Sequence, residues 1–176
     1  MHSTIGPICS RAFSGLLAMN VGTKSEQGGY EALDRTLAAL LAGEHDWIAN
    51  LANTAALLYT ELADLNWAGF YLLKEGELVL GPFQGKPACV RIALGKGVCG
   101  TAAAQRRSIV VPDVHEFPGH IACDSVSNSE LVVPLIRGGE LLGVLDLDSP
   151  LFERFDDDDR RGLEAIAATV VRASET

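Results

Sequence analysis

Apolar residues recur at the spacing of an α-helix in two stretches of the first half of the chain. One stretch runs from Tyr30 to Leu41 and the other from Trp47 to Leu65, with apolar residues mostly three or four positions apart. Gly43 separates the two stretches, and Asp46 stands where an acidic side chain favours the start of a helix. The pattern therefore predicts two packed N-terminal helices.

From Trp67 onward the spacing of apolar residues changes to that of β-strands. Ala68 to Leu73 and Leu78 to Leu80 are apolar runs on either side of Lys74-Glu75-Gly76-Glu77, a composition typical of a turn. We therefore predict an antiparallel hairpin in this region. A third strand is expected from Cys89 to Leu94.

The second half of the chain consists of apolar segments and one long polar segment. A short helix, a strand, a polar loop, a second hairpin and a last helix are expected, in this order, at Val98 to Arg106, Ile109 to Val111, Pro112 to Ser129, Leu131 to Leu147 and Leu163 to Val170. Together with the first half, this order predicts an α+β fold in which helices flank one mainly antiparallel sheet.

Four consecutive aspartates, Asp156 to Asp159, precede the last helix. A metal site or a site for a charged substrate is one interpretation of such a run. The helix dipole, however, favours negative charge at a helix N-terminus, and a run of like charges is usually hydrated. We therefore predict a solvated capping turn.

Length and composition are those of one globular domain. The chain has 176 residues, and 48% of them are hydrophobic, which excludes a disordered composition. Fourteen basic and twenty-three acidic residues give a formal net charge of -9, which repels nucleic-acid phosphates and anionic lipid. No window approaches the roughly 18 apolar residues of a membrane span. We expect neither nucleic acid nor a membrane as a partner.

The N-terminal segment differs in composition from the rest of the chain. Pro7 and Arg11 interrupt an early apolar run that lacks the basic start of a secretory signal, and residues 22–29 are rich in glycine and polar residues. We predict a flexible extension over residues 1–28, a folded domain over residues 29–176 and a cytoplasmic location. Disulfides in a reducing cytoplasm are usually transient and catalytic. Cys9 lies in the extension and is given no role.

The polar loop contains a cysteine in the stretch Pro118-Gly-His-Ile-Ala-Cys-Asp124, and its length points to a functional loop. Thiol redox chemistry needs an exposed thiolate, a second thiol and an acid that assists the substrate oxygen. Cys123 is the candidate thiolate, activated by His120 or by backbone N–H groups, and Cys89 and Cys99 are candidates for the second thiol. The alternative is that each cysteine is a small buried residue without a catalytic role. We give the two interpretations equal weight for Cys99, and we favour the catalytic one for Cys123.

Three carboxylates are candidates for the acid. Asp146 and Asp148 alternate by two along a predicted strand, so they point to one face, and Glu130 opens the neighbouring strand. If the three converge, repulsion and desolvation raise the pKa of one of them and keep a proton available at neutral pH. The alternative is a strand end that emerges into solvent.

Two further motifs suggest a dinucleotide site and a zinc site, but the rest of the sequence favours neither. Gly95-Lys-Gly-Val-Cys-Gly100 has the spacing of a dinucleotide fingerprint, but the strands around it are predicted to pair as hairpins and not as βαβ units. A zinc site is conceivable from the thiols and imidazoles of Cys89, Cys99, His115, His120 and Cys123. Because these residues contain no CxxC pair, we expect no metal and no cofactor.

Seven segments of the chain resemble, in order, the GAF-domain family of free methionine-R-sulfoxide reductases. They are Leu65 to Leu73, Gly81 to Cys89, Gly97 to Ala102, Asp113 to His115, Pro118 to Asp124, Ser127 to Glu130 and Gly143 to Ser149. The resemblance covers roughly residue 30 to the end and implies a GAF-like catalytic domain. It also implies reduction of free methionine-R-sulfoxide, thioredoxin as reductant and a homodimer.

The resemblance further implies roles for individual thiols and acids. Cys123 attacks the sulfoxide sulfur and becomes a sulfenic acid, Cys89 condenses with it, and Cys99 is a third thiol with a secondary or alternative resolving role. The sulfoxide oxygen must be protonated as it leaves sulfur, and this role falls to the carboxyl groups already described. These are Glu130, Asp146 and Asp148.

Trp67 and Tyr71 would form the wall around the methyl-sulfur end of the substrate, unless they are ordinary core residues. For the substrate carboxylate, our candidates are backbone N–H groups around Ile121, Ala122 and Cys123, in a turn that directs amides inward. The main rival function is a binding-only GAF module that senses a small molecule, because a fold does not dictate a function.

Overall fold

The structure is a computed structural model, and it describes residues 28–121 and 124–174. It contains four α-helices, one 3-10 helix and six strands in the described ranges. In chain order these are α1 (Gly28–Leu40), α2 (Trp47–Glu61), β1 (Trp67–Lys74), β2 (Glu77–Gly85), β3 (Arg91–Ala93), α3 (Gly97–Gln105), β4 (Ile109–Val111), η1 (Val114–Glu116), β5 (Ser129–Arg137), β6 (Glu140–Ser149) and α4 (Asp157–Ala173).

The strands form one sheet in the order β3-β2-β1-β6-β5-β4, and each neighbouring pair is antiparallel. Both predicted hairpins are present, as β1 with β2 and as β5 with β6. The prediction of an α+β fold with a mainly antiparallel sheet is confirmed. Among the described residues, none of the helices combines the length and the apolar character that a transmembrane span requires.

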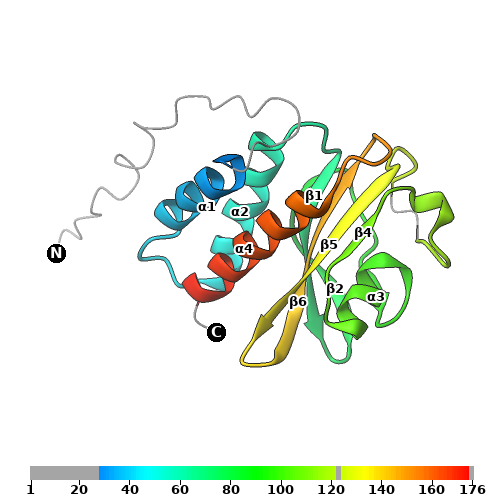
Figure 1. Cartoon of the computed structure of the whole chain (residues 1–176). Coiled ribbons are helices and arrows are strands. Elements are labelled where there is room, and N and C mark those ends of the chain that lie inside the picture. The colour runs from blue at the N-terminus through cyan, green and yellow to red at the C-terminus, as the bar shows by residue number, and fades with distance from the viewer. Residues whose placement is uncertain (1–27, 122–123, 175–176) are drawn as a thin grey trace.

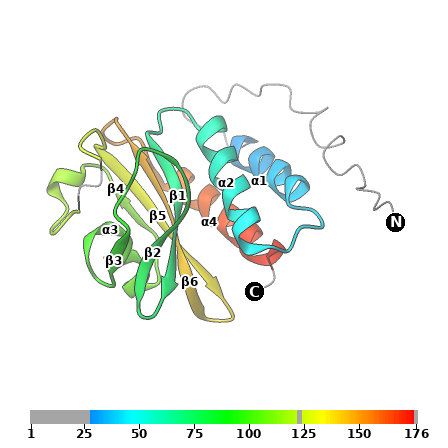
Figure 2. The same cartoon turned by 180° about the vertical axis from the view of Figure 1, so that it is seen from behind.

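The helices divide between the two faces of the sheet. Figures 1 and 2 show α1, α2 and α4 together on one side and α3 alone on the other. The alternation of side chains in the strands produces this division, because neighbouring residues point to opposite faces. In β6, Leu145 and Leu147 pack among α1, α2 and α4, whereas Val144 packs with α3. Asp146 and Asp148 therefore share the α3 face.

Side chains cap two of the helices as the sequence predicts. Asp46 accepts a hydrogen bond from the N–H of Ala49 at the start of α2, and Asp156 accepts bonds from the N–H groups of Asp158 and Asp159 at the start of α4. Each bond satisfies a backbone donor that has no partner inside its helix.

The aspartate run is not fully solvated, and this part of the prediction is wrong. Asp159 is only 5% exposed, because its carboxylate accepts a hydrogen bond from the hydroxyl of Tyr30 in α1 and pairs with Arg154. Asp159 also completes a capping box by accepting a bond from the N–H of Asp156. The run therefore caps α4 and attaches α1 to it.

Some boundaries differ from the predictions. Helix α1 already begins at Gly28, α2 ends before Leu65, and β3 is shorter than expected, so that Cys89 precedes the strand. The long loop contains η1, which Asp113 caps. The other residues of the predicted extension lie outside the described ranges, so the division at residue 28 stays a prediction.

The glycines of the suspected dinucleotide motif have a packing role. A Cβ atom on Gly100 would lie 2.3 Å from the carbonyl oxygen of Ala93, so only glycine lets α3 approach β3 this closely. Gly95 and Gly97 have φ values of 78° and 58°, which favour glycine. The neighbouring strands are antiparallel and form no βαβ unit. The structure thus argues against a dinucleotide-binding site at this motif.

Candidate active site

Two adjacent strands, β5 and β6, carry the candidate acids on the face of the sheet that α3 covers, and β1 lies beside them. Trp67 of β1 pairs with Asp148 of β6, and Asp148 pairs with Glu130 of β5, so these three residues form one row. Asp146 lies in the next row, between Gly69 and Val132. The three carboxyl groups expected to converge line the same pocket.

An aromatic wall stands beside these acids. The ring of Trp67 stacks on Tyr71 at a centroid distance of 5.9 Å and on Phe83 at 5.4 Å. Gly69 makes room for this stack, because a Cβ atom there would lie 2.6 Å from the Trp67 ring. The indole N–H donates a hydrogen bond to the carbonyl of Lys86 at 3.2 Å, which fixes the orientation of the ring.

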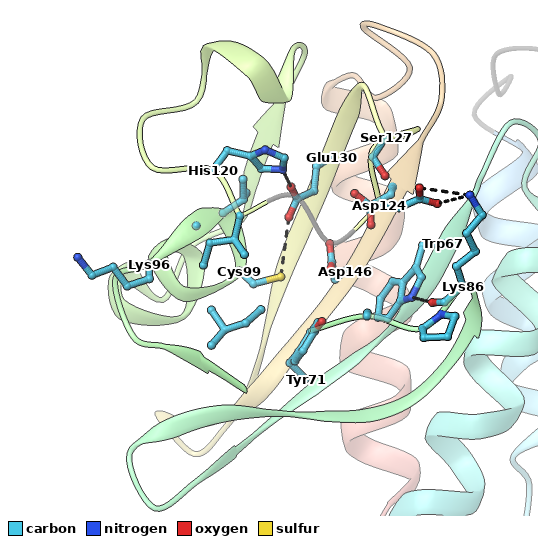
Figure 3. A pocket seen from close by; sticks show the side chains of 17 residues that line it. Trp67, Tyr71, Lys86, Lys96, Cys99, His120, Asp124, Ser127, Glu130 and Asp146 are labelled. Atoms are coloured by element: carbon cyan, nitrogen blue, oxygen red, sulfur yellow. Dashed lines mark hydrogen bonds and ion pairs between the residues drawn. The ribbon is translucent and has the colours of Figure 1, made fainter. Parts of the chain in front are cut away.

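The pocket lies between this wall, the N-terminal half of α3 and the loop that carries His120, Asp124 and Ser127 (Figure 3). It is narrow, with about 30 Å³ accessible to water-sized spheres, which is room for about two water molecules. Carboxyl groups, one thiol and one imidazole face the aromatic rings across it. One wall of the pocket is thus aromatic, and the opposite wall consists of groups that can donate or accept a proton.

The surroundings of the acids raise their pKa values. Glu130 is 6% exposed and Asp146 is 5% exposed, while Asp148 keeps some contact with solvent. Burial, and then the nearby carboxylates, raise the pKa of Glu130 and of Asp148 well above the usual range, and burial raises the pKa of Asp146 to about 6. In the described ranges no lysine or arginine forms an ion pair with them. The cluster therefore holds protons at neutral pH.

His120 approaches the same cluster but does not supply a positive charge. Its Nε2 lies 3.7 Å from Oε2 of Glu130, beyond ordinary hydrogen-bond distance. Burial, and then the positive charge of His115, lower the pKa of His120, so the imidazole is neutral at pH 7. Because the raised pKa of Glu130 keeps that group protonated, the contact is not an ion pair. His120 is thus a poor candidate for an electrostatic activator of a thiolate.

Cys99 extends from α3 into the pocket and is 4% exposed. Its Sγ lies 3.8 Å from Oε1 of Glu130. Burial, followed by the charges of Asp146 and Glu130, raises the pKa of Cys99 well above its ordinary value. The group is a protonated thiol at neutral pH and hence a weak nucleophile.

The other predicted site residues occupy different positions. Cys89 is half-buried and packs against the α3-side core but does not line the pocket. Ile121 lines the pocket and is 38% exposed. Ala122 and Cys123 lie outside the described residues, and their roles remain predictions.

The structure does not assemble the zinc set considered from the sequence within the described residues. His115 is exposed, and its Nδ1 lies 2.8 Å from Asp113. Neither His115 nor Cys89 lines the pocket.

Several residues of the site were missed in the sequence. Lys86 pairs with Asp124 at 3.2 Å at the edge of the pocket, and Asp124 also accepts a bond from the N–H of Val126. Asn66 donates to the hydroxyl of Ser127, and a hydrogen bond with Ser127 lowers the pKa of Asp148 against the effect of burial. Lys86, Asp124 and Ser127 lie in motif segments, but their contacts depend on folding.

Comparisons with known proteins agree on one family. The family profile described as "GAF domain" matches residues 48–175. The free methionine-R-sulfoxide reductase of Escherichia coli (strain K12) is 55% identical over 147 residues, which cover 84% of this chain and 89% of that protein. The chain belongs to the GAF-domain family of free methionine-R-sulfoxide reductases.

Solved structures of free methionine-R-sulfoxide reductases share the fold. The reduced form of the Staphylococcus aureus protein is 53% identical with a TM-score of 0.80, over 82% of this chain and 94% of that one. The Neisseria meningitidis reductase, in complex with its substrate, is 43% identical with a TM-score of 0.83, over 89% and 94%. The expected GAF-like fold and the expectation of an oxidoreductase are confirmed.

Proposed function

We propose that this chain reduces free L-methionine-R-sulfoxide to methionine. The observation that carries the proposal is the pocket in which the Trp67 and Tyr71 rings face the carboxyl groups of Glu130, Asp146 and Asp148. The rings would hold the methyl-sulfur end, and the acids would meet the sulfoxide oxygen. The E. coli and N. meningitidis relatives that carry this activity in their names support the substrate assignment.

Cys123 is the proposed nucleophile. Its thiolate attacks the sulfoxide sulfur and forms a sulfur–sulfur bond, while the sulfoxide oxygen takes up two protons and leaves as water. Water then attacks the sulfur of Cys123, the sulfur–sulfur bond breaks, and methionine leaves with both electrons of that bond. One proton is released, and Cys123 becomes a sulfenic acid. Sulfur of the substrate is thereby reduced by two electrons and sulfur of Cys123 is oxidised by two.

Cys89 is the proposed resolving thiol. Its sulfur attacks the sulfenic acid, a disulfide with Cys123 forms, and the oxygen departs as water after protonation. Thioredoxin then reduces the disulfide by thiol exchange and restores both thiols. Cys99 is assigned a secondary role, because its buried and protonated thiol is a weak nucleophile.

The carboxyl groups are the proposed proton source. Glu130 lies at the centre of the cluster, and its raised pKa keeps a proton at neutral pH. Asp146 and Asp148 hold that pKa up by their proximity and replace the proton after transfer. The reaction so described needs no metal and no cofactor.

The remaining assignments complete the proposal. Backbone N–H groups around Ile121 and Ala122 bind the substrate carboxylate, which distinguishes a free amino acid from a residue within a peptide. The protein acts in the cytoplasm and as a homodimer.

Consumption of NADPH through thioredoxin reductase and thioredoxin tests the activity. We expect turnover with free methionine-R-sulfoxide, and none with the S epimer or with a peptide that contains the sulfoxide. Cys123→Ser should abolish turnover. Turnover by that variant would contradict the mechanism, and turnover of peptides alone would contradict the substrate.

Peptide mapping under non-reducing conditions tests the resolving thiol. After one turnover without reductant, Cys89 should be linked to Cys123. A link between Cys99 and Cys123 in wild-type protein would reverse the assignment.

A further inference from the structure

The pocket brings a thiol and two carboxyl groups close enough to share one ion. Single donor atoms of Cys99, Glu130 and Asp146 all lie within 4.8 Å of one another, and all three residues are buried. They come from three elements, since α3 supplies the sulfur while β5 and β6 supply the oxygens. Figure 3 shows the three side chains directed toward one point.

One of these donor atoms lacks a partner. Oδ1 of Asp146 is buried and accepts no hydrogen bond in the described structure, although the residue is only 5% exposed. A buried polar atom without a partner is costly, and native proteins usually supply a proton donor, a water molecule or a cation. This atom therefore has an open position for a ligand inside the pocket.

His120 lies beside the donor set but outside it. Its Nε2 is 3.7 Å from Oε2 of Glu130, whereas the atoms within 4.8 Å of one another belong to Cys99, Glu130 and Asp146 alone. Sulfur and oxygen donors together favour zinc, whereas magnesium and calcium prefer oxygen alone. The zinc set considered from the sequence contained Cys99 but neither of these two acids.

The distances suit a tetrahedral ion after a small contraction. Zinc–sulfur and zinc–oxygen bonds of about 2.3 and 2.0 Å place the two ligand atoms roughly 3.5 Å apart. Sγ of Cys99 and Oε1 of Glu130 are separated by 3.8 Å. The pocket has about 30 Å³ of accessible space, which is enough for one ion and a water molecule.

We propose that Cys99, Glu130 and Asp146 form a zinc-binding site, that His120 turns toward the bound ion as a fourth ligand, and that zinc reversibly inhibits the enzyme by occupying the acids that face the substrate. Zinc here is an inhibitor and not a resident cofactor. The inhibition rests on the proposed function, whereas the binding does not. The ligands are neutral or anionic when bound, and the net charge of -9 favours a cation.

Binding is tested without any activity measurement. A variant with Cys9, Cys89 and Cys123 replaced by serine retains Cys99 as its single thiol. Titration with Co²⁺ should give a thiolate-to-metal charge-transfer band that saturates at one ion per chain and disappears on addition of one equivalent of Zn²⁺. Replacement of the last thiol, Cys99→Ser, should remove the band. A missing band in the single-thiol variant would overturn the site.

Two histidine variants define the fourth ligand. His120→Gln should weaken Zn²⁺ binding, measured by calorimetry, by about 10- to 100-fold, the range found when a supporting group of a metal site is lost. His115→Gln is the matched control, because His115 is exposed and bonds to Asp113. Equal affinities in both variants would exclude His120. Should Cys99→Ser fail to fold, Glu130→Gln must show the same loss of Zn²⁺ affinity.

Inhibition is tested on the wild-type enzyme. Zn²⁺ should raise the KM for methionine-R-sulfoxide and leave kcat unchanged, and EDTA should restore the original rate. Binding without inhibition would remove the regulatory part and keep the site. An enzyme without sulfoxide reductase activity would contradict the proposed function alone, because the Co²⁺ titration does not depend on it.

Discussion

Acidic residues gather in two regions of the chain, and the two groups have opposite surroundings. Glu130, Asp146 and Asp148 enter the pocket on the α3 face and form no ion pair with lysine or arginine within the described residues. Asp157 and Asp159 belong to the start of α4, where guanidinium groups and backbone N–H groups surround the carboxylates. Both groups bring negative charges close together, but only the second neutralises them.

The consequences for protonation are opposite. A hydrogen bond from Arg160 lowers the pKa of Asp157, so this group stays ionised at neutral pH and stabilises the helix terminus. Burial raises the pKa of Glu130, so this group keeps a proton that a reaction can use. The comparison teaches that the groups in contact with a carboxyl group decide whether it stabilises the fold or supplies protons.

Among the substitutions that distinguish the pocket acids from the acids at the start of α4, Glu130→Gln should have the largest effect. Loss of the proton source should lower kcat by about 10²- to 10³-fold, within the usual contribution of a general acid. The free energy of unfolding should not fall, because a buried carboxyl group is replaced by a neutral group of similar shape. Steady-state kinetics and urea unfolding measure the two quantities. Full activity in this variant would remove Glu130 from the mechanism.

Stability should respond to pH with opposite sign in the two groups. The pKa of Asp146 rises from 3.8 unfolded to about 6 folded, so the folded state binds more protons between these values and loses stability as pH rises through them. The change is about 3 kcal/mol at most, taken from the two-unit shift. Asp157, with its lowered pKa, acts in the other direction at lower pH.

Asp146→Asn provides the control for this pH dependence. Urea unfolding is measured at several pH values between 4 and 6, the range over which the pKa of Asp146 is shifted. As the pH rises through this range, the variant should lose less stability than the wild type. The same slope in both proteins would mean that Asp146 has an ordinary pKa.

Asp159→Asn should affect stability and leave activity unchanged. The substitution weakens the bonds to Tyr30 and Arg154 and the capping box, which should lower the free energy of unfolding by about 2 kcal/mol. Thermal unfolding and the coupled reductase assay measure both properties. A large loss of kcat without a loss of stability would contradict the structural role.

Asp157→Asn should have the smallest effect of the series. Its carboxylate pairs with Arg160 and Arg161 at the surface, where water and salt screen such interactions. The value of kcat should not change, and the unfolding midpoint should fall only slightly. A clear loss of activity would show that this region communicates with the pocket.

The fold was largely predictable from local patterns. Period-2 alternation in β6 placed Asp146 and Asp148 on one face, and the helix cap at Asp46 was readable from residue type and position. The burial of Asp159 was not predictable, because it depends on Tyr30 from another helix. Local signals describe single elements, whereas this contact arises from the packing of α1 on α4.

The acids of the pocket were predictable from the sequence, but their contacts and several other residues that line the pocket were not. Glu130, Asp146 and Asp148 were identified together, and the structure brings them to one pocket. The 3.8 Å contact between Cys99 and Glu130 depends on how closely α3 approaches the sheet, which Gly100 permits. Nothing in the spacing of the sequence reveals that approach.

The protonation of the pocket acids at neutral pH is the central claim, and infrared difference spectroscopy measures it directly. At pH 7 the wild-type protein should show the carbonyl stretch of a protonated carboxyl group, because the pKa of Glu130 lies well above its usual range. The band should be lost or shifted in Glu130→Gln and retained in Asp159→Asn. If the wild-type spectrum contains only ionised carboxylates at pH 7, the pocket stores no proton and the account is wrong.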